Sequence, residues 1–92
     1  MTTRGGRILV ADDDTGVLTA ARLLLKRHFA VVQTESNPER LPDLLKGGFD
    51  VVLLDMNFAR GADSGAEGLH WLERIIEIDP GMVVVLMTAY GD

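Results

Sequence analysis

The sequence predicts a single α/β domain built on a parallel β-sheet. Short apolar, β-branched runs recur along the 92 residues, and segments with a helical spacing of apolar residues separate them. Most of these runs are continuous rather than alternating, which is typical of strands covered on both faces. Because connections between parallel strands are right-handed crossovers, this alternating order predicts one sheet with helices packed against it.

The apolar runs are the predicted strands. The second run turns polar early, which favours a position at the edge of the sheet, whereas the others stay apolar to their ends. The third run stops abruptly at Asp55. The predicted strands are Ile8–Ala11, Ala30–Gln33, Val51–Leu54 and Met82–Met87.

The first predicted helix spans Thr15–Phe29. Either Asp14 or Thr15 is suited to the N-cap position, because a short oxygen-bearing side chain accepts hydrogen bonds from the free backbone N–H groups there. Apolar residues at helical spacing predict the buried stripe of this helix. They are Val17, Leu18, Ala21, Leu24 and Leu25, followed by His28.

The segment after the second strand predicts only a short or late-starting helix. Asn37 and Pro38 suit the cap and the first helical position, but Pro42 would interrupt a further turn. We expect Gly47 or Gly48 to close this element, since glycine commonly ends helices.

The third helix is predicted more clearly. Ser64 and Glu67 have the S-x-x-E spacing of a capping box, in which each residue satisfies a backbone N–H of the first turn. Asp79–Gly81 reads Asp-Pro-Gly and is expected to end the helix. The predicted buried stripe is Leu69, Leu72, Ile75 and Ile76.

Composition narrows the class of protein. Apolar residues make up 47% of the chain, enough for a core, and the absence of cysteine excludes disulfides and cysteine-ligated metals. A net charge of −5 argues against binding to nucleic acid or to an anionic membrane. No segment has the length and hydrophobicity of a signal peptide or membrane span, so we expect a soluble, cytoplasmic domain.

Carboxylates stand at the ends of two predicted strands. Asp12 and Asp13 follow the first strand, and Asp55 ends the third. In parallel sheets, ligands bind at the carboxyl ends of the strands, so neighbouring strands would bring these acids into one crevice. Each close pair of like charges costs roughly 4 kcal/mol at an effective dielectric constant near 20. Mg²⁺, which prefers oxygen ligands, would relieve this repulsion; the alternative is a solvated loop that only caps a helix.

Three motifs carry a family resemblance. "ILVADDD", "VVLLDMN" and "VVVLMTAYGD" resemble the first, third and fourth strand ends of response-regulator receiver domains in bacterial two-component systems. The sequence around the third and fourth strand ends is most similar to receivers of NtrC-type transcriptional activators. The resemblance covers essentially the whole chain and implies a flavodoxin-like, CheY-like parallel sheet with strand order 2-1-3-4.

The resemblance also implies a role for each site residue. Asp55 would accept a phosphoryl group from a sensor histidine kinase, and phosphorylation would regulate an output domain, expected to be transcriptional. Mg²⁺ would be held by Asp12, Asp13, Asp55 and the backbone carbonyl of Asn57. Thr88 would hydrogen-bond a phosphoryl oxygen and report phosphorylation. The chain itself would then be a signalling domain rather than an enzyme.

The sequence departs from the family pattern in two places. Ala59 stands where receivers usually have proline, and the stretch before Gly68 is longer than usual. The family also has a further helix, strand and helix, with a lysine that pairs with the phosphoryl group, so residues 1–92 are interpreted as a receiver domain truncated after its fourth strand. The strongly apolar Met82–Met87 would then be an open edge, and we expect a homodimer or segment-exchanged oligomer through it.

Two other functions compete with this prediction. A Mg²⁺-dependent phosphohydrolase with an aspartyl-phosphate intermediate would need a second acid two residues after Asp55, where this chain has Asn57. A receiver that no longer switches and serves only for dimerisation is the other alternative. The intact acids argue against that alternative, and the missing lysine argues for it.

Overall fold

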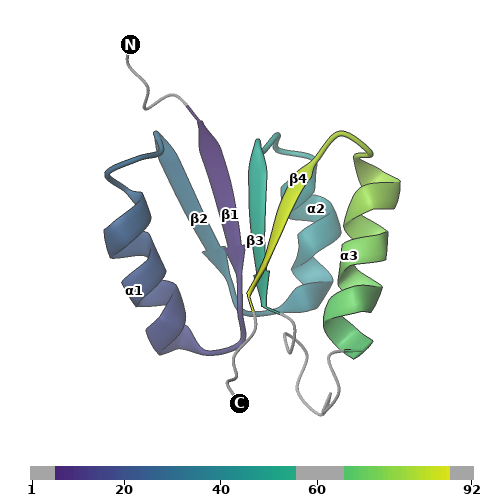
Figure 1. Ribbon diagram of the computed structural model, residues 1–92, viewed down its shortest axis with the longest axis horizontal. Helices are drawn as coiled ribbons and strands as arrows, with labels where there is room; N and C mark the ends of the chain where they lie inside the picture. The colour runs from purple at the N-terminus through teal and green to yellow at the C-terminus, as the bar shows by residue number, and fades with distance from the viewer. Residues whose placement is uncertain (1–5, 56–65, 88–92) are drawn as a thin grey trace.

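The protein is seen in a computed structural model that describes residues 6–55 and 66–87. Its strands form one parallel sheet in the order β2-β1-β3-β4 (Figure 1), which confirms the predicted fold class, strand order and edge position of the second strand. The strands are β1 (Arg7–Ala11), β2 (Val31–Glu35), β3 (Val51–Asp55) and β4 (Val83–Met87).

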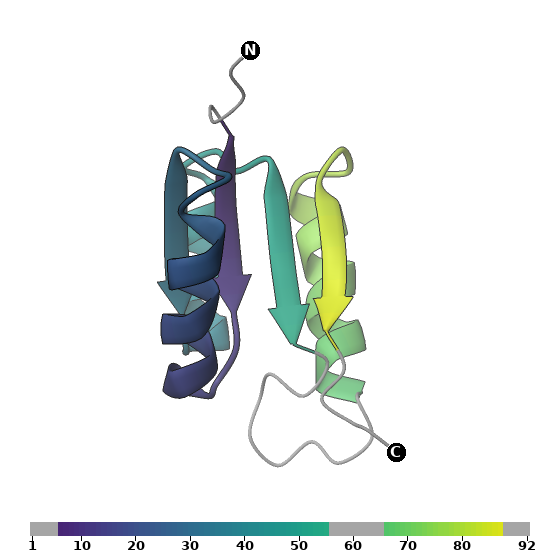
Figure 2. The same cartoon turned by 60° about the vertical axis from the view of Figure 1, so that its left-hand side comes forward.

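The helices lie on both faces of the sheet. Helix α1 (Thr15–Leu25) covers one face, whereas α2 (Leu41–Leu45) and α3 (Ala66–Ile78) cover the other (Figure 2). A 3₁₀ turn, η1 (Pro38–Arg40), precedes α2. Within the two described ranges, every helix is too short or too polar to span a lipid bilayer.

Helix α1 ends earlier than predicted, at Leu25 rather than Phe29. The backbone N–H groups of His28 and Phe29 both donate to the carbonyl of Leu25, at 2.8 and 3.0 Å, so the chain turns away from the helix axis. The Phe29 side chain then packs against the sheet instead of extending the stripe. Three residues of the predicted stripe, Val17, Leu24 and His28, are also exposed, which corrects that part of the prediction.

The second helix is short and starts late, as predicted. Its first turn contains Pro42. Proline is tolerated there because N–H groups of the first turn have no partner within the helix. Gly48 follows with a φ of 85°, a left-handed conformation that glycine adopts without strain. Pro42 therefore stands in the first turn of α2 rather than ending the element.

Helix α3 ends at Ile78, directly before the predicted Asp-Pro-Gly stop. Ile75 of its predicted stripe is fully buried and Leu72 packs beside the core, whereas Ile76 is partly exposed. Ser64 of the predicted capping box lies outside the described residues.

Alternate strand residues supply two core clusters, one on each face. The larger lies beneath α2 and α3, and the smaller lies beneath α1 and contains Ile8, Val10 and Leu18. Because β1 and β3 are the inner strands, their carboxyl ends are held by packing on both sides. The larger cluster comprises Leu9, Ala11, Leu41, Leu45, Val52, Leu54, Ile75 and Met82.

Candidate functional site

The β1–β3 register brings the two acid-bearing strand ends together. Ile8 pairs with Val51 and Ala11 with Leu54, so the next residues along, Asp12 and Asp55, are neighbours at the carboxyl edge of the sheet. The backbone N–H of Asp12 also donates to the carbonyl of Glu35 on β2, at 3.2 Å. The inner position of β1 thus fixes Asp12 between two strands.

Three carboxylates form a compact cluster at this edge. Asp12, Asp13 and Asp55 each offer a carboxylate oxygen that lies within 4.8 Å of the other two. Asp12 and Asp55 are only 6% exposed, and Asp13 is half-buried. The predicted crevice is therefore present, with its acids partly withdrawn from water.

The third aspartate of the run has a different task. The Asp14 carboxylate caps α1 by accepting from the backbone N–H groups of Gly16 at 2.8 Å and Val17 at 3.3 Å. Its own backbone N–H donates to Oδ1 of Asp12 at 2.9 Å. The cap by Asp14, one of the two predicted N-caps, is confirmed. The turn that orients the Asp12 carboxylate was not predicted, because a hydrogen bond of this kind has no separate sequence signal.

Electrostatics disfavour the charged form of Asp12. Burial raises the pKa of its carboxyl above the usual range, the hydrogen bond from Asp14 lowers it, and the charges of Asp55 and Asp13 raise it further. A cation among the carboxylates would offset this cost. Hard oxygen ligands within 4.8 Å of one another suit Mg²⁺, which binds through one or two carboxylates and keeps several waters.

Of the predicted site residues, Asp12, Asp13 and Asp55 are brought together. Asn57 and Thr88, the remaining predicted ligand and switch residue, lie outside the described residues, as does Ala59. The roles predicted for these residues stay predictions.

Comparison with known proteins identifies the family. Residues 8–92 match the family model described as the response regulator receiver domain. The chain therefore belongs to this family, and it is a receiver domain of a two-component response regulator, a class of signalling domain.

Relatives among characterised proteins include transcriptional regulators of the NtrC type, as predicted. The chain is 30% identical to the transcriptional regulatory protein GlrR of Escherichia coli K12 over 92 residues, which cover 99% of this chain and 20% of that protein. It is 33% identical over 91 residues to sporulation initiation phosphotransferase F of Bacillus subtilis, covering 94% of this chain and 66% of the relative. The chain thus spans about one fifth of GlrR and about two thirds of the Bacillus protein.

Solved structures share the fold. The N-terminal receiver domain of a Bacteroides fragilis response regulator is 46% identical with a TM-score of 0.77, over 88% of this chain and 64% of that one. A Burkholderia pseudomallei response regulator with a phosphorylated aspartic acid and a calcium ion is 26% identical with a TM-score of 0.71, over 96% of this chain and 49% of that one.

Proposed function

We propose that this receiver is a phosphoacceptor whose Asp55 takes a phosphoryl group from a phosphohistidine of a sensor kinase. The observation that carries the proposal is the cluster of Asp12, Asp13 and Asp55, with its oxygens within 4.8 Å of one another. Phosphoryl transfer needs positioning and charge neutralisation more than covalent help from the protein, and this cluster supplies both requirements once a cation is bound.

The proposed reaction uses Asp55 as the nucleophile. A carboxylate oxygen of Asp55 forms the new bond to phosphorus while the phosphorus–nitrogen bond to the histidine breaks, and the imidazole leaves with the bonding electron pair. The end of β3 fixes the position of Asp55, and its 6% exposure keeps bulk water from most of the carboxylate. Asp12 and Asp13 lie beside it and would hold the cation.

Mg²⁺ fits this donor set, and the backbone carbonyl of Asn57 is the further ligand that the family pattern suggests. When bound, the ion would offset the negative charge shared by the carboxylates and the incoming phosphoryl oxygens. Thr88 would donate its hydroxyl to a phosphoryl oxygen, so that the added charge of the aspartyl phosphate biases a switch.

The output of this switch is proposed from the relatives. GlrR and ZraR of Escherichia coli are transcriptional regulatory proteins, of which this chain matches 20% and 18% of the length. We therefore infer that phosphorylation of Asp55 regulates a transcriptional output domain. The histidine kinase is the corresponding upstream partner.

Phosphorylation can be tested with acetyl phosphate and Mg²⁺, followed by intact mass spectrometry. We expect the mass of one phosphoryl group to be added to the wild-type chain and to Asp43→Asn, a control that changes an acid whose side chain is 87% exposed. Asp55→Asn should gain none. An unmodified wild type would overturn the proposal in favour of an interaction module, and repeated turnover of a phosphoester would favour a phosphohydrolase.

We also propose that a second copy of the chain pairs along the outer edge of β4, which has no neighbouring strand among the described residues. Val83 and Val85 are 56% and 47% exposed, and β4 contains no charged residue, so two copies can approach without repulsion at this edge. An antiparallel pair centred on Val85 would place apolar side chains opposite one another throughout.

Light scattering tests this pairing. The wild-type chain should have the mass of a dimer at tens of micromolar, and Val85→Lys should shift it to the monomer because a charge would face its own copy. Leu23→Lys, which places the same charge on the exposed face of α1, should remain dimeric. A monomeric wild type would exclude the dimer.

A further inference from the structure

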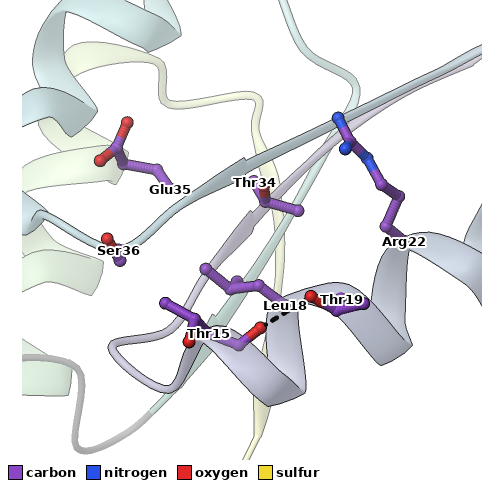
Figure 3. A pocket seen from close by; sticks show the side chains of 7 residues that line it. All are labelled: Thr15, Leu18, Thr19, Arg22, Thr34, Glu35 and Ser36. Atoms are coloured by element: carbon purple, nitrogen blue, oxygen red, sulfur yellow. Dashed lines mark hydrogen bonds between the residues drawn. The ribbon is translucent and has the colours of Figure 1, made fainter.

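An open groove runs between α1 and the outer strand β2 (Figure 3). Its volume is about 330 Å³, and Leu18 forms its buried floor. The remaining side chains that face it are mostly hydroxyl-bearing, and they come from one face of α1 and from the end of β2. They are Thr15, Thr19 and Arg22 on the helix, and Thr34, Glu35 and Ser36 on the strand side, where Glu35 is paired with Arg40.

The groove carries a positive charge that has no carboxylate partner in the described part of the chain. The ion pairs there join Arg40 to Glu35, Lys46 to Asp43, and Arg74 to Glu77, and none includes Arg22. The Glu35 carboxylate points away from the α1 wall (Figure 3), where it accepts from the N–H of Asn37 at 3.0 Å. Arg22 is therefore available to an anionic group in the groove.

The backbone of β2 completes the groove along its outer side. Val31 donates its N–H to the carbonyl of Gly6, the residue before β1, and the Glu35 carbonyl accepts from Asp12, so these residues direct their backbone groups inward. Because backbone groups alternate along a strand, those of Val32 and Thr34 face the open edge. Among the described residues, the Thr34 carbonyl accepts a hydrogen bond from the side-chain amide of its neighbour Gln33, a long 3.4 Å bond that another strand could replace.

We propose that an extended, acidic segment of a partner polypeptide adds to the edge of β2 and places one carboxylate against Arg22. The backbone of Thr34 would provide the pairing, as in other complexes formed by strand addition. The Thr19 hydroxyl donates to the Thr15 carbonyl at 3.0 Å and can still accept a hydrogen bond, and the Ser36 hydroxyl can donate or accept, so both suit a polar side chain. This binding surface is independent of phosphoryl transfer at Asp55.

The proposal can be tested with a short synthetic peptide in which threonine and valine alternate around one glutamate. Two-dimensional nitrogen–proton correlation NMR spectra of the isotope-labelled wild-type chain would be recorded as this peptide is added. We expect the amide signals of Val32 and Thr34 to shift and their hydrogen exchange to slow. A peptide N-methylated at alternate residues loses about two backbone hydrogen bonds and should bind roughly tenfold more weakly.

A matched pair of variants tests the ionic contact. Arg22→Gln should weaken binding about threefold, as expected for one exposed ion pair, whereas Arg27→Gln, outside the groove, should leave it unchanged. Thermal melting of both variants checks that each is folded. The proposal is overturned if the amides of β2 do not respond, if they respond in equal measure to the N-methylated peptide, if the shifts fall on β4 instead, or if the two variants bind alike.

Discussion

Asp12 and Asp55 lie side by side at the ends of the two inner strands, each with only 6% of its surface exposed. Two buried carboxylates in contact range repel each other, and Asp13 adds a third oxygen within 4.8 Å. A fold keeps such an arrangement at a cost to its own stability. A bound cation would therefore relieve this repulsion and stabilise the folded state.

Asp12→Asn should stabilise the metal-free protein at neutral pH by roughly 1–4 kcal/mol, the energy of two like charges about 4 Å apart between bulk water and an effective dielectric constant near 20. Burial is the largest cause of the raised pKa of Asp12. The folded state thus holds this proton more tightly than the unfolded chain, whose aspartate pKa is about 3.9. The stabilisation from this proton is complete below that pH and is lost as the pH rises through the higher folded pKa.

Urea unfolding of both proteins in EDTA, at a series of pH values from acid to neutral, would check this sign. The gain from Asp12→Asn should be small in acid, grow as the pH rises through the folded pKa of Asp12, and then level off. The asparagine keeps an oxygen that can accept from the N–H of Asp14, so the turn is preserved. A stability difference that does not depend on pH would contradict the prediction.

Mg²⁺ should raise the melting temperature of the wild-type chain. At ten times its dissociation constant, a ligand of the folded state adds roughly 1.4 kcal/mol, or about 5–10 °C for a domain of this size. Asp13→Asn removes one proposed ligand and should reduce the shift, whereas Asp43→Asn should keep it. Differential scanning fluorimetry against NaCl of equal ionic strength separates binding from screening, and equal shifts in both salts would refute the Mg²⁺ site.

The sequence predicted the sheet and the position of the acids because both depend on strong, local patterns. Continuous apolar runs predicted the inner strands, and a carboxylate after such a run can only emerge at the strand end. The proximity of Asp12 to Asp55 then followed from the strand order that the resemblance to receivers implied. The observed register of Ala11 with Leu54 confirms it.

The end of α1 could not be predicted in this way, because a tertiary contact decides it. Phe29 continues the helical spacing, yet it leaves the helix and packs against Gly6, where an added Cβ would lie 3.2 Å from the ring. Leu24 similarly fits the stripe but is 67% exposed. Helical spacing identifies a possible face, whereas burial depends on which elements pack there.

Asp14→Ala should destabilise the fold by about 1 kcal/mol, because the first turn of α1 would lose its side-chain cap. The N–H groups of Gly16 and Val17, now bonded to Asp14 Oδ1, would be left to water. Asp14→Ser should retain most of the stability, since its hydroxyl can accept the same bonds. Chemical denaturation of the three proteins would check this, and equal losses for alanine and serine would show that charge rather than capping matters.

Two leucines on helices should respond very differently to truncation. Leu41 is fully buried at the start of α2, whereas Leu23 on α1 is 58% exposed. Leu41→Ala should cost about 2–5 kcal/mol, because it removes apolar contacts and leaves a cavity in the larger core cluster. Leu23→Ala should stay within about 0.5 kcal/mol of wild type, as surface changes do. Urea unfolding midpoints measure both losses, and similar values for the two variants would mean that α2 does not cover the core as the structure indicates.

Leu41→Ala should also weaken Mg²⁺ binding. Leu41 belongs to the same core cluster as Leu54, the residue before Asp55, so a cavity at Leu41 would loosen the end of β3. A Mg²⁺ titration of the same variant would detect this loss.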